Sequence, residues 1–194
     1  MRGSKRQLQK EQTRENILQT AYRVYAAQGF TATTAMIAKE AQVSHGTIFV
    51  HFPSVNDLIS QLITAFGSQL TAEMHALAKK EDSIETLLTA YLDILSGHEA
   101  FYIRLISEKS LLPEDVPFIL ANTQSNIAYH FSIVIAREIA QRTVKNIPAA
   151  MIFNTWMGLL HYYLLNKDLF SPDEPLLPRY GSQLTAVFLE LIKQ

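Results

Sequence analysis

Residues 33–52, with the sequence TTAMIAKEAQVSHGTIFVHF, hold two short helical patterns separated by a brief break. Thr33 is suited to cap the first pattern and Ser44 the second, because a hydroxyl can accept a hydrogen bond from the first backbone amides of a helix. Val43 and Ile48 flank the second cap at the spacing of a hydrophobic staple. A two-turn helix that follows another short helix is typical of a helix-turn-helix.

The rest of the chain also repeats its apolar residues at helical spacing, and no segment alternates apolar and polar residues in the manner of a strand. Gly29 should end the first helix, with a basic arm before Lys10, and a charged turn is expected at 79–82. The pattern predicts an all-α chain of about nine helices, the longer ones at 10–28, 54–78, 83–96, 99–111, 113–142, 148–166 and 179–192.

Charge is unevenly distributed along the sequence. Residues 1–54 hold seven Lys/Arg against three Glu, whereas the remainder holds ten Lys/Arg against fifteen acids, so the two parts carry +4 and −5. A basic segment joined to an acidic one is expected when a phosphate-binding module is attached to a module that does not bind nucleic acid. We therefore divide the chain into a head, residues 1–53, and a body, residues 54–194.

The chain has no cysteine and begins with a polar, basic stretch, which predicts a cytoplasmic protein without disulfides. Residues 146–166 carry no Asp, Glu, Lys or Arg and are long enough to span a bilayer. Asn154, Thr155, His161 and Pro148 argue against a span, so we expect a helix buried by its own domain and by a partner chain.

The head resembles the N-terminal domain of the TetR family of bacterial transcription repressors. The resemblance rests on the basic helix ending in Gly29-Phe30 and on the following TTAMIAKEAQVSHGTIFVHFPSVNDL. It covers about a quarter of the chain, and the body agrees with the family only in length and helical character. The resemblance implies a homodimer whose two recognition helices, here residues 44–51, enter the major groove of a palindromic operator.

The resemblance also implies roles for individual residues. Thr34 should present its backbone N–H, with its hydroxyl as a further donor, to a phosphate, Ser44 should act as a cap, and Gly46 should allow close approach to DNA. His45 and Thr47 are the candidates for base contacts. The predicted DNA-binding residues are Thr33, Thr34, Ser44, His45, Gly46, Thr47, Phe49, Val50, His51 and Ser54.

Two residues depart from the family pattern. Phe49 stands where the family usually has Tyr, and Val55 stands where it usually has Lys, so two phosphate contacts are missing. Their absence should weaken sequence-independent binding and reduce its dependence on salt. Phe49 can instead contact a thymine methyl group, and His51 can offset one of the missing phosphate contacts.

The resemblance implies that a small molecule binds the body and releases DNA. Aromatic residues with a few polar neighbours in predicted body helices suggest an apolar or weakly polar aromatic effector. Asn126, His130 and Asn154 are the most telling, because a polar group in an apolar helix needs a partner. The candidate pocket residues are Phe66, Tyr91, Phe101, Tyr102, Leu105, Asn126, His130, Phe131, Asn154, Trp156 and His161.

The helices expected at 148–166 and 179–192 carry more apolar surface than one chain can cover, which predicts a four-helix dimer interface. Its candidate residues are Met151, Thr155, Leu159, Tyr162, Tyr163, Leu184, Val187, Phe188 and Leu191.

The six histidines lack metal-ligand spacing, and no nucleophile–base pair or glycine-rich phosphate loop occurs, so neither a metal, a cofactor nor an enzyme is expected. The sequence favours a ligand-responsive DNA-binding repressor. Two alternatives stay open: an architectural or cell-cycle factor with the same head and no effector, and a helical enzyme or adaptor whose head resembles the motif by chance.

Overall fold

The computed structural model describes residues 2–78 and 83–194, with side chains described for 5–76 and 83–194. Within these residues the chain is helical, as predicted, apart from turns and an isolated bridge between Val144 and Lys193. The turn predicted at 79–82 lies outside them. Contacts divide the chain into a first unit, Met1–Ala65 with Ala100–Ile119, and a second unit, Phe66–Glu99 with Leu120–Gln194. The functional boundary after Pro53 stays a prediction.

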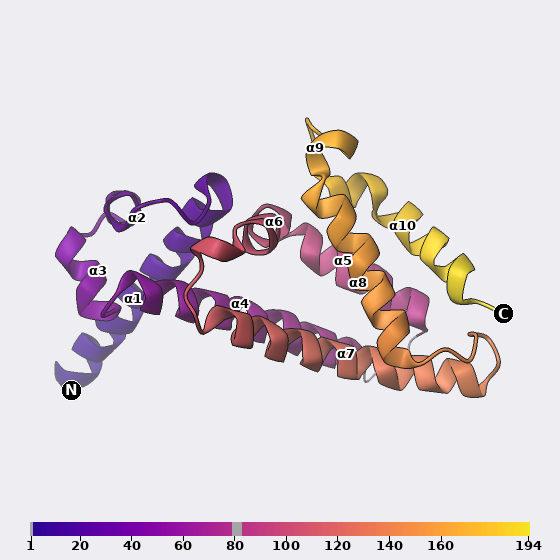
Figure 1. Ribbon diagram of the computed structural model, residues 1–194. Coiled ribbons are helices and arrows are strands. Elements are labelled where there is room, and N and C mark those ends of the chain that lie inside the picture. The colour runs from indigo at the N-terminus through magenta and orange to yellow at the C-terminus, as the bar shows by residue number, and fades with distance from the viewer. Residues whose placement is uncertain (1, 79–82) are drawn as a thin grey trace. The chain divides into compact units, whose positions relative to one another are not determined.

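The first unit holds the predicted helix-turn-helix and the helices beside it (Figure 1). α1 packs on α2, and α2 packs on α3. The helices are α1 (Arg2–Gln28), α2 (Thr34–Glu40), α3 (His45–His51), the start of α4 (Val55–Ala78), most of α6 (Glu99–Ser107), the 3-10 helix η1 (Lys109–Leu111) and the start of α7 (Val116–Ala140).

α1 differs from the prediction at its N-terminal end. Its helical backbone begins at Arg2 rather than at Lys10, so the expected basic arm continues α1. At its other end Gly29 has a φ of 78°, a left-handed conformation that glycine adopts without steric cost. Phe30 then stacks on Tyr25 with ring centroids 5.0 Å apart, which fixes the chain direction after the helix.

The second unit contains the later parts of α4 and α7 together with α5 (Ile84–Ser96), α8 (Ala149–Leu165), α9 (Lys167–Phe170) and α10 (Leu176–Ile192). α10 packs on both α5 and α8. The described residues thus form ten α-helices rather than about nine, because the short α9 was not predicted. The helices predicted at 99–111 and 113–142 also end earlier, at Ser107 and Ala140.

α10 begins three residues before the predicted start at Arg179. Pro178 occupies the third position of the helix, where a missing N–H costs no intrahelical hydrogen bond. The N–H groups of Leu176 and Leu177 donate to the two carboxylate oxygens of buried Glu99, at 2.7 and 2.8 Å. A carboxylate far away in the sequence therefore caps α10, and the helix starts ahead of Pro178.

The uncharged segment predicted as a buried helix forms α8. On one side of α8, residues such as Phe153, Trp156 and Leu160 are buried in the second unit, whereas Met151 and Tyr162 are exposed. No helix among the described residues has the length and apolar character needed to span a membrane.

Candidate DNA-binding site

α2 is capped as predicted. Thr33 is the N-cap residue, and its hydroxyl accepts a hydrogen bond from the N–H of Met36 at 3.4 Å. The next residue, Thr34, is buried, and its Oγ1 lies 2.9 Å from Nε2 of His45 at the start of α3. The Thr34 hydroxyl thus holds the imidazole in place, which leaves the backbone N–H as the group of Thr34 predicted to meet a phosphate.

α3 is capped by Ser44. The Ser44 hydroxyl accepts from the N–H of Thr47 at 3.2 Å, and the two side-chain oxygens lie 2.7 Å apart. Ser44 is therefore a cap, as the resemblance implied. Because the Thr47 hydroxyl is hydrogen-bonded to this cap, a base contact by Thr47 would use its methyl group or require the hydroxyl to change partner.

Ile48 and Phe52 fix the rotation of α3, because both side chains are fully buried. Val50, 69% exposed, and Phe49, 39% exposed, lie on the opposite side, whereas His51 is half-buried with its Nδ1 buried. His45 and Gly46 are exposed at the start of the helix, and the His45 ring meets Phe49 edge-on at 5.2 Å. The exposed face of α3 is thus mostly apolar with one imidazole.

The turn between α2 and α3 is set by a conformation that the sequence did not reveal. Gln42 has a φ of 58°, a left-handed geometry that is uncommon for a residue with a side chain. The Asn16 amide of α1 donates to the Ala41 carbonyl at 3.0 Å, and the Val43 N–H donates to Ala38 O at 3.0 Å. These bonds fix the angle between the two short helices.

α1 places two cations near the end of α3. Burial lowers the pKa of His51, and the positive charges of Lys10 and Arg14 lower it further. Arg14 lies over the Phe52 ring, 5.2 Å from its centroid, and donates to Gln61. Their spacing of four residues on one helix is the signal of this pair in the sequence.

Glu108 joins the end of α1 to the segment after α6. Its carboxylate accepts a hydrogen bond from the Phe30 N–H at 2.6 Å and forms an ion pair with Arg104 at 2.9 Å. A β-carbon built on Gly29 would lie 2.5 Å from a Glu108 oxygen, so the close approach also depends on that glycine. This carboxylate positions the turn that leads into α2.

Comparison with known proteins decides the family of this helix-turn-helix. Residues 17–62 match the model for bacterial regulatory proteins of the tetR family. The HTH-type transcriptional repressor Rv3405c of Mycobacterium tuberculosis is 32% identical over 88 residues, which cover 45% of this chain and 46% of the relative. The helix-turn-helix of this chain is therefore of the TetR type. The matches span 34% to 46% of the length of the curated relatives.

The TetR fold extends over nearly the whole chain. A TetR-family regulator from Agrobacterium tumefaciens superimposes with a TM-score of 0.79 and 22% identity, covering 95% of this chain and all of the other. FadR from Bacillus subtilis, solved in complex with stearoyl-CoA, gives a TM-score of 0.74 at 15% identity, covering 90% and 97% of the two chains. These relatives carry names of regulators, in agreement with the prediction of a non-enzyme.

The candidate effector residues divide between the two units of this TetR-type chain. Phe101, Tyr102 and Leu105 are buried in the first unit, and the others belong to the second. There, Phe131 meets Tyr91 and Phe153 with ring centroids 6.0 and 5.4 Å apart. Of the other candidates, Phe66 and Trp156 are buried and His161 is half-buried.

The polar candidates do not share one environment. His130 is buried beside His75, with ring centroids 5.1 Å apart, as the argument from burial predicted. Asn126 and Asn154 are exposed, because their helix positions turn away from the second unit, so the argument that they need buried partners is wrong for them. Whether any of the three contacts an effector stays a prediction.

The candidate dimer residues also divide into two groups. Leu184 and Phe188 are buried inside the second unit, where Phe188 meets Trp156 at 5.2 Å, so they are core residues of one chain. Leu159 and Tyr163 are half-buried, and the exposed members are Met151, Thr155, Tyr162, Val187 and Leu191. Helical spacing alone did not separate the face of α10 that packs on α8 from the face that is exposed.

Proposed function

We propose that this protein is a transcriptional repressor that binds a palindromic operator as a homodimer through α3. The observation that carries the proposal is the exposed face of α3, held outward by buried Ile48 and Phe52. A helix of this kind presents its side chains to base edges when it enters the major groove.

His45 is the base-reading residue that the contacts support best. Its hydrogen bond with Thr34 and its edge-on contact with Phe49 orient the ring without covering it. Phe49 and Val50 offer apolar surface for thymine methyl groups. Specificity then depends on an oriented imidazole and on apolar contacts.

Phosphate binding relies on α1 and on backbone groups in this proposal. Lys10 and Arg14 lie close enough to the C-terminal end of α3 to affect His51, and they supply charge that Phe49 and Val55 do not. Removing one cation that binds a phosphate should reduce the salt dependence of DNA binding by about one unit of slope.

The test of base reading compares operator with random DNA. His45→Ala should lower operator affinity by about ten-fold, corresponding to one contact worth roughly 1–3 kcal/mol. Lys10→Ala should weaken binding to both duplexes and reduce the salt slope. If His45→Ala leaves the ratio of operator to random affinity unchanged, the assignment of His45 is wrong.

We further propose that an apolar or weakly polar effector binds the second unit. The Trp156 indole N–H is buried without a hydrogen-bond partner in the described part of the chain, so an effector with one acceptor group would satisfy it. The acyl chain of the stearoyl-CoA in the Bacillus subtilis relative is compatible with a ligand that carries an apolar group. Effector and operator should weaken each other's binding by the same factor, which calorimetry with and without operator can test.

A second candidate is an architectural DNA-binding factor that has no effector. The contacts of Phe131 with Tyr91 and Phe153 favour it, because mutually packed rings occupy space that a ligand would need. If DNA affinity is unaffected by every acyl, steroid or aromatic compound in a broad library, this candidate is preferred.

A further inference from the structure

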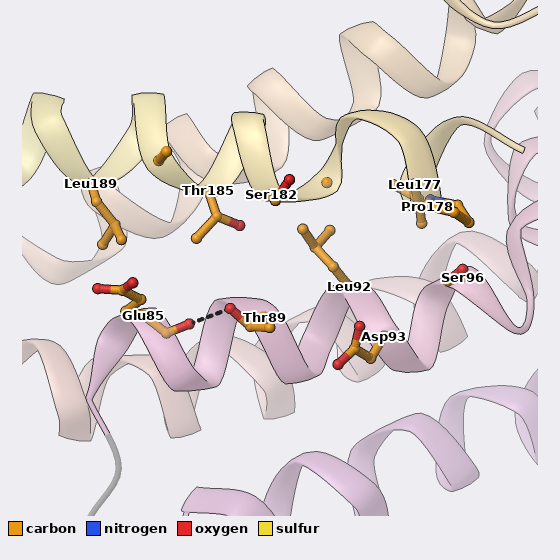
Figure 2. Close-up of a pocket in the computed structure, with 12 residues that line it drawn as sticks. Glu85, Thr89, Leu92, Asp93, Ser96, Leu177, Pro178, Ser182, Thr185 and Leu189 are labelled. Atoms are coloured by element: carbon orange, nitrogen blue, oxygen red, sulfur yellow. Dashed lines mark hydrogen bonds between the residues drawn. The ribbon is translucent and has the colours of Figure 1, made fainter.

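A groove between α5 and α10 has the features of a binding site separate from the candidate effector residues. It has a volume of about 410 Å³, and all its lining residues belong to the second unit. Leu92 of α5 and Gly181 of α10 both line it, and a β-carbon on Gly181 would lie 3.3 Å from Leu92 Cδ1. Figure 2 shows Leu92 of α5 and Thr185 and Leu189 of α10 extending toward one another across this space.

Thr185 provides a polar group within the groove. Only 5% of this residue is exposed, and its hydroxyl has no hydrogen-bond partner within the described chain. In Figure 2 its side chain extends from α10 into the space above α5. Buried hydroxyls are normally paired, so an unpaired one that lines a groove indicates a missing ligand atom.

Two carboxylates give the groove its charge. Glu85 and Asp93 line it from α5 and are eight residues apart, which corresponds to roughly 12 Å along a helix. The Lys193 ammonium lies 3.3 Å from Glu85, so the chain itself places a primary ammonium at one end of the groove. Asp93, about two turns further along α5, is exposed.

We propose that this groove binds a linear polyamine, with one ammonium at Asp93 and another replacing Lys193 at Glu85. The methylene chain between them lies over Leu92 and Leu189, and an inner amine meets Thr185. This site goes beyond the proposed regulation of DNA binding and does not depend on it. It is also compatible with a dimer, because Val187 and Leu191 lie on another side of α10, about 140° around the helix from Ser182 and Ala186.

The experiment is calorimetric titration of the full-length chain with spermidine, with putrescine as a diamine too short to reach both carboxylates. Spermidine should bind at one saturable site per chain and more tightly than putrescine. Asp93→Asn should weaken spermidine binding about five-fold or more, whereas Glu190→Gln, an exposed acid on α10 outside the groove, should leave it unchanged. Lys193→Gln should strengthen binding, because it removes the competing ammonium.

Thr185→Val separates a binding role from a structural one. Valine has a similar shape and removes an unpaired buried hydroxyl, so the melting temperature should stay the same or rise while spermidine affinity falls about three-fold. The proposal is overturned if spermidine binding does not saturate, if Asp93→Asn and Glu190→Gln weaken it equally, or if Thr185→Val leaves it unchanged.

Discussion

Gly29 and Gly46 are two glycines of the head with different physical requirements. Gly29 has a left-handed backbone and adjoins the Glu108 carboxylate, whereas a β-carbon on Gly46 would come no closer than 3.9 Å to the Ser44 hydroxyl. Gly29→Ala should lower the free energy of unfolding by at least about 1–2 kcal/mol, measured by urea denaturation. Gly46→Ala should leave it unchanged or raised while DNA affinity falls, and equal losses of stability in both variants would contradict this account.

The buried residue His130 should make the folding stability of the protein depend on pH. Burial, and then the charge of His75, lower its pKa below the ordinary value of about 6.5. The unfolded chain therefore binds a proton more readily, so stability falls as pH drops below about 6.5 and is fully present above it. His51 should change stability with pH in the same direction, because burial and the charges of Lys10 and Arg14 lower its pKa too.

Melting temperatures at pH 5.5 and 7.5 check this prediction. The wild-type chain should melt at a higher temperature at pH 7.5, and the difference should shrink, without vanishing, in His130→Gln because His51 still contributes. A His130→Gln variant that keeps the full difference would show that His130 is not responsible.

At the scale of the element, two helices of the second unit are capped at their N-terminal ends by carboxylates distant in sequence. Glu99 caps α10, and Glu138 accepts a hydrogen bond from the Ile84 N–H at the start of α5, at 2.8 Å. Removing a charged hydrogen-bond partner of buried amides should cost about 2–3 kcal/mol. Urea denaturation of Glu99→Gln should show this loss, whereas the exposed Glu190→Gln should change stability by less than about 0.5 kcal/mol.

These caps show which parts of the elements the sequence can predict. Thr33 and Ser44 could be predicted as caps because each hydroxyl meets an amide three residues later, and Ser54 and Ser83 cap their helices in the same way. Glu99 and Leu176 are 77 residues apart, so no local pattern joins them. For the same reason the start of α10 was misplaced.

The candidate DNA-binding face could be inferred from local spacing. Once the buried positions of a helix are known, helical spacing determines which neighbouring positions are exposed. The hydrogen bond between Thr34 and His45 and the left-handed Gln42 could not be inferred, since both depend on how two helices pack. The division of α10 between buried Leu184 and exposed Val187 likewise depends on the contacts with α5 and α8.

At the scale of the whole molecule, dimerisation is the main prediction. Gly158 lies between Thr155 and Tyr162 on the exposed side of α8, and a β-carbon there would meet nothing within 4 Å in the single chain. Gly158→Glu should therefore preserve the helical fold but place a charge in the proposed interface. Light scattering after gel filtration should give a monomer for this variant and a dimer for Ala72→Glu, an exposed control on α4. A dimeric Gly158→Glu would place the interface elsewhere.

Selection of bound duplexes from a pool of random DNA sequences tests the central claim most directly. The wild-type chain should enrich a palindrome whose half-sites are separated by about one helical turn or more, and binding should weaken with salt. The double variant His45→Ala, Thr47→Ala should enrich no such sequence while keeping its fold and its dimer. Enrichment of the same palindrome by that double variant, or no enrichment by the wild-type chain, would contradict the proposal that α3 reads an operator.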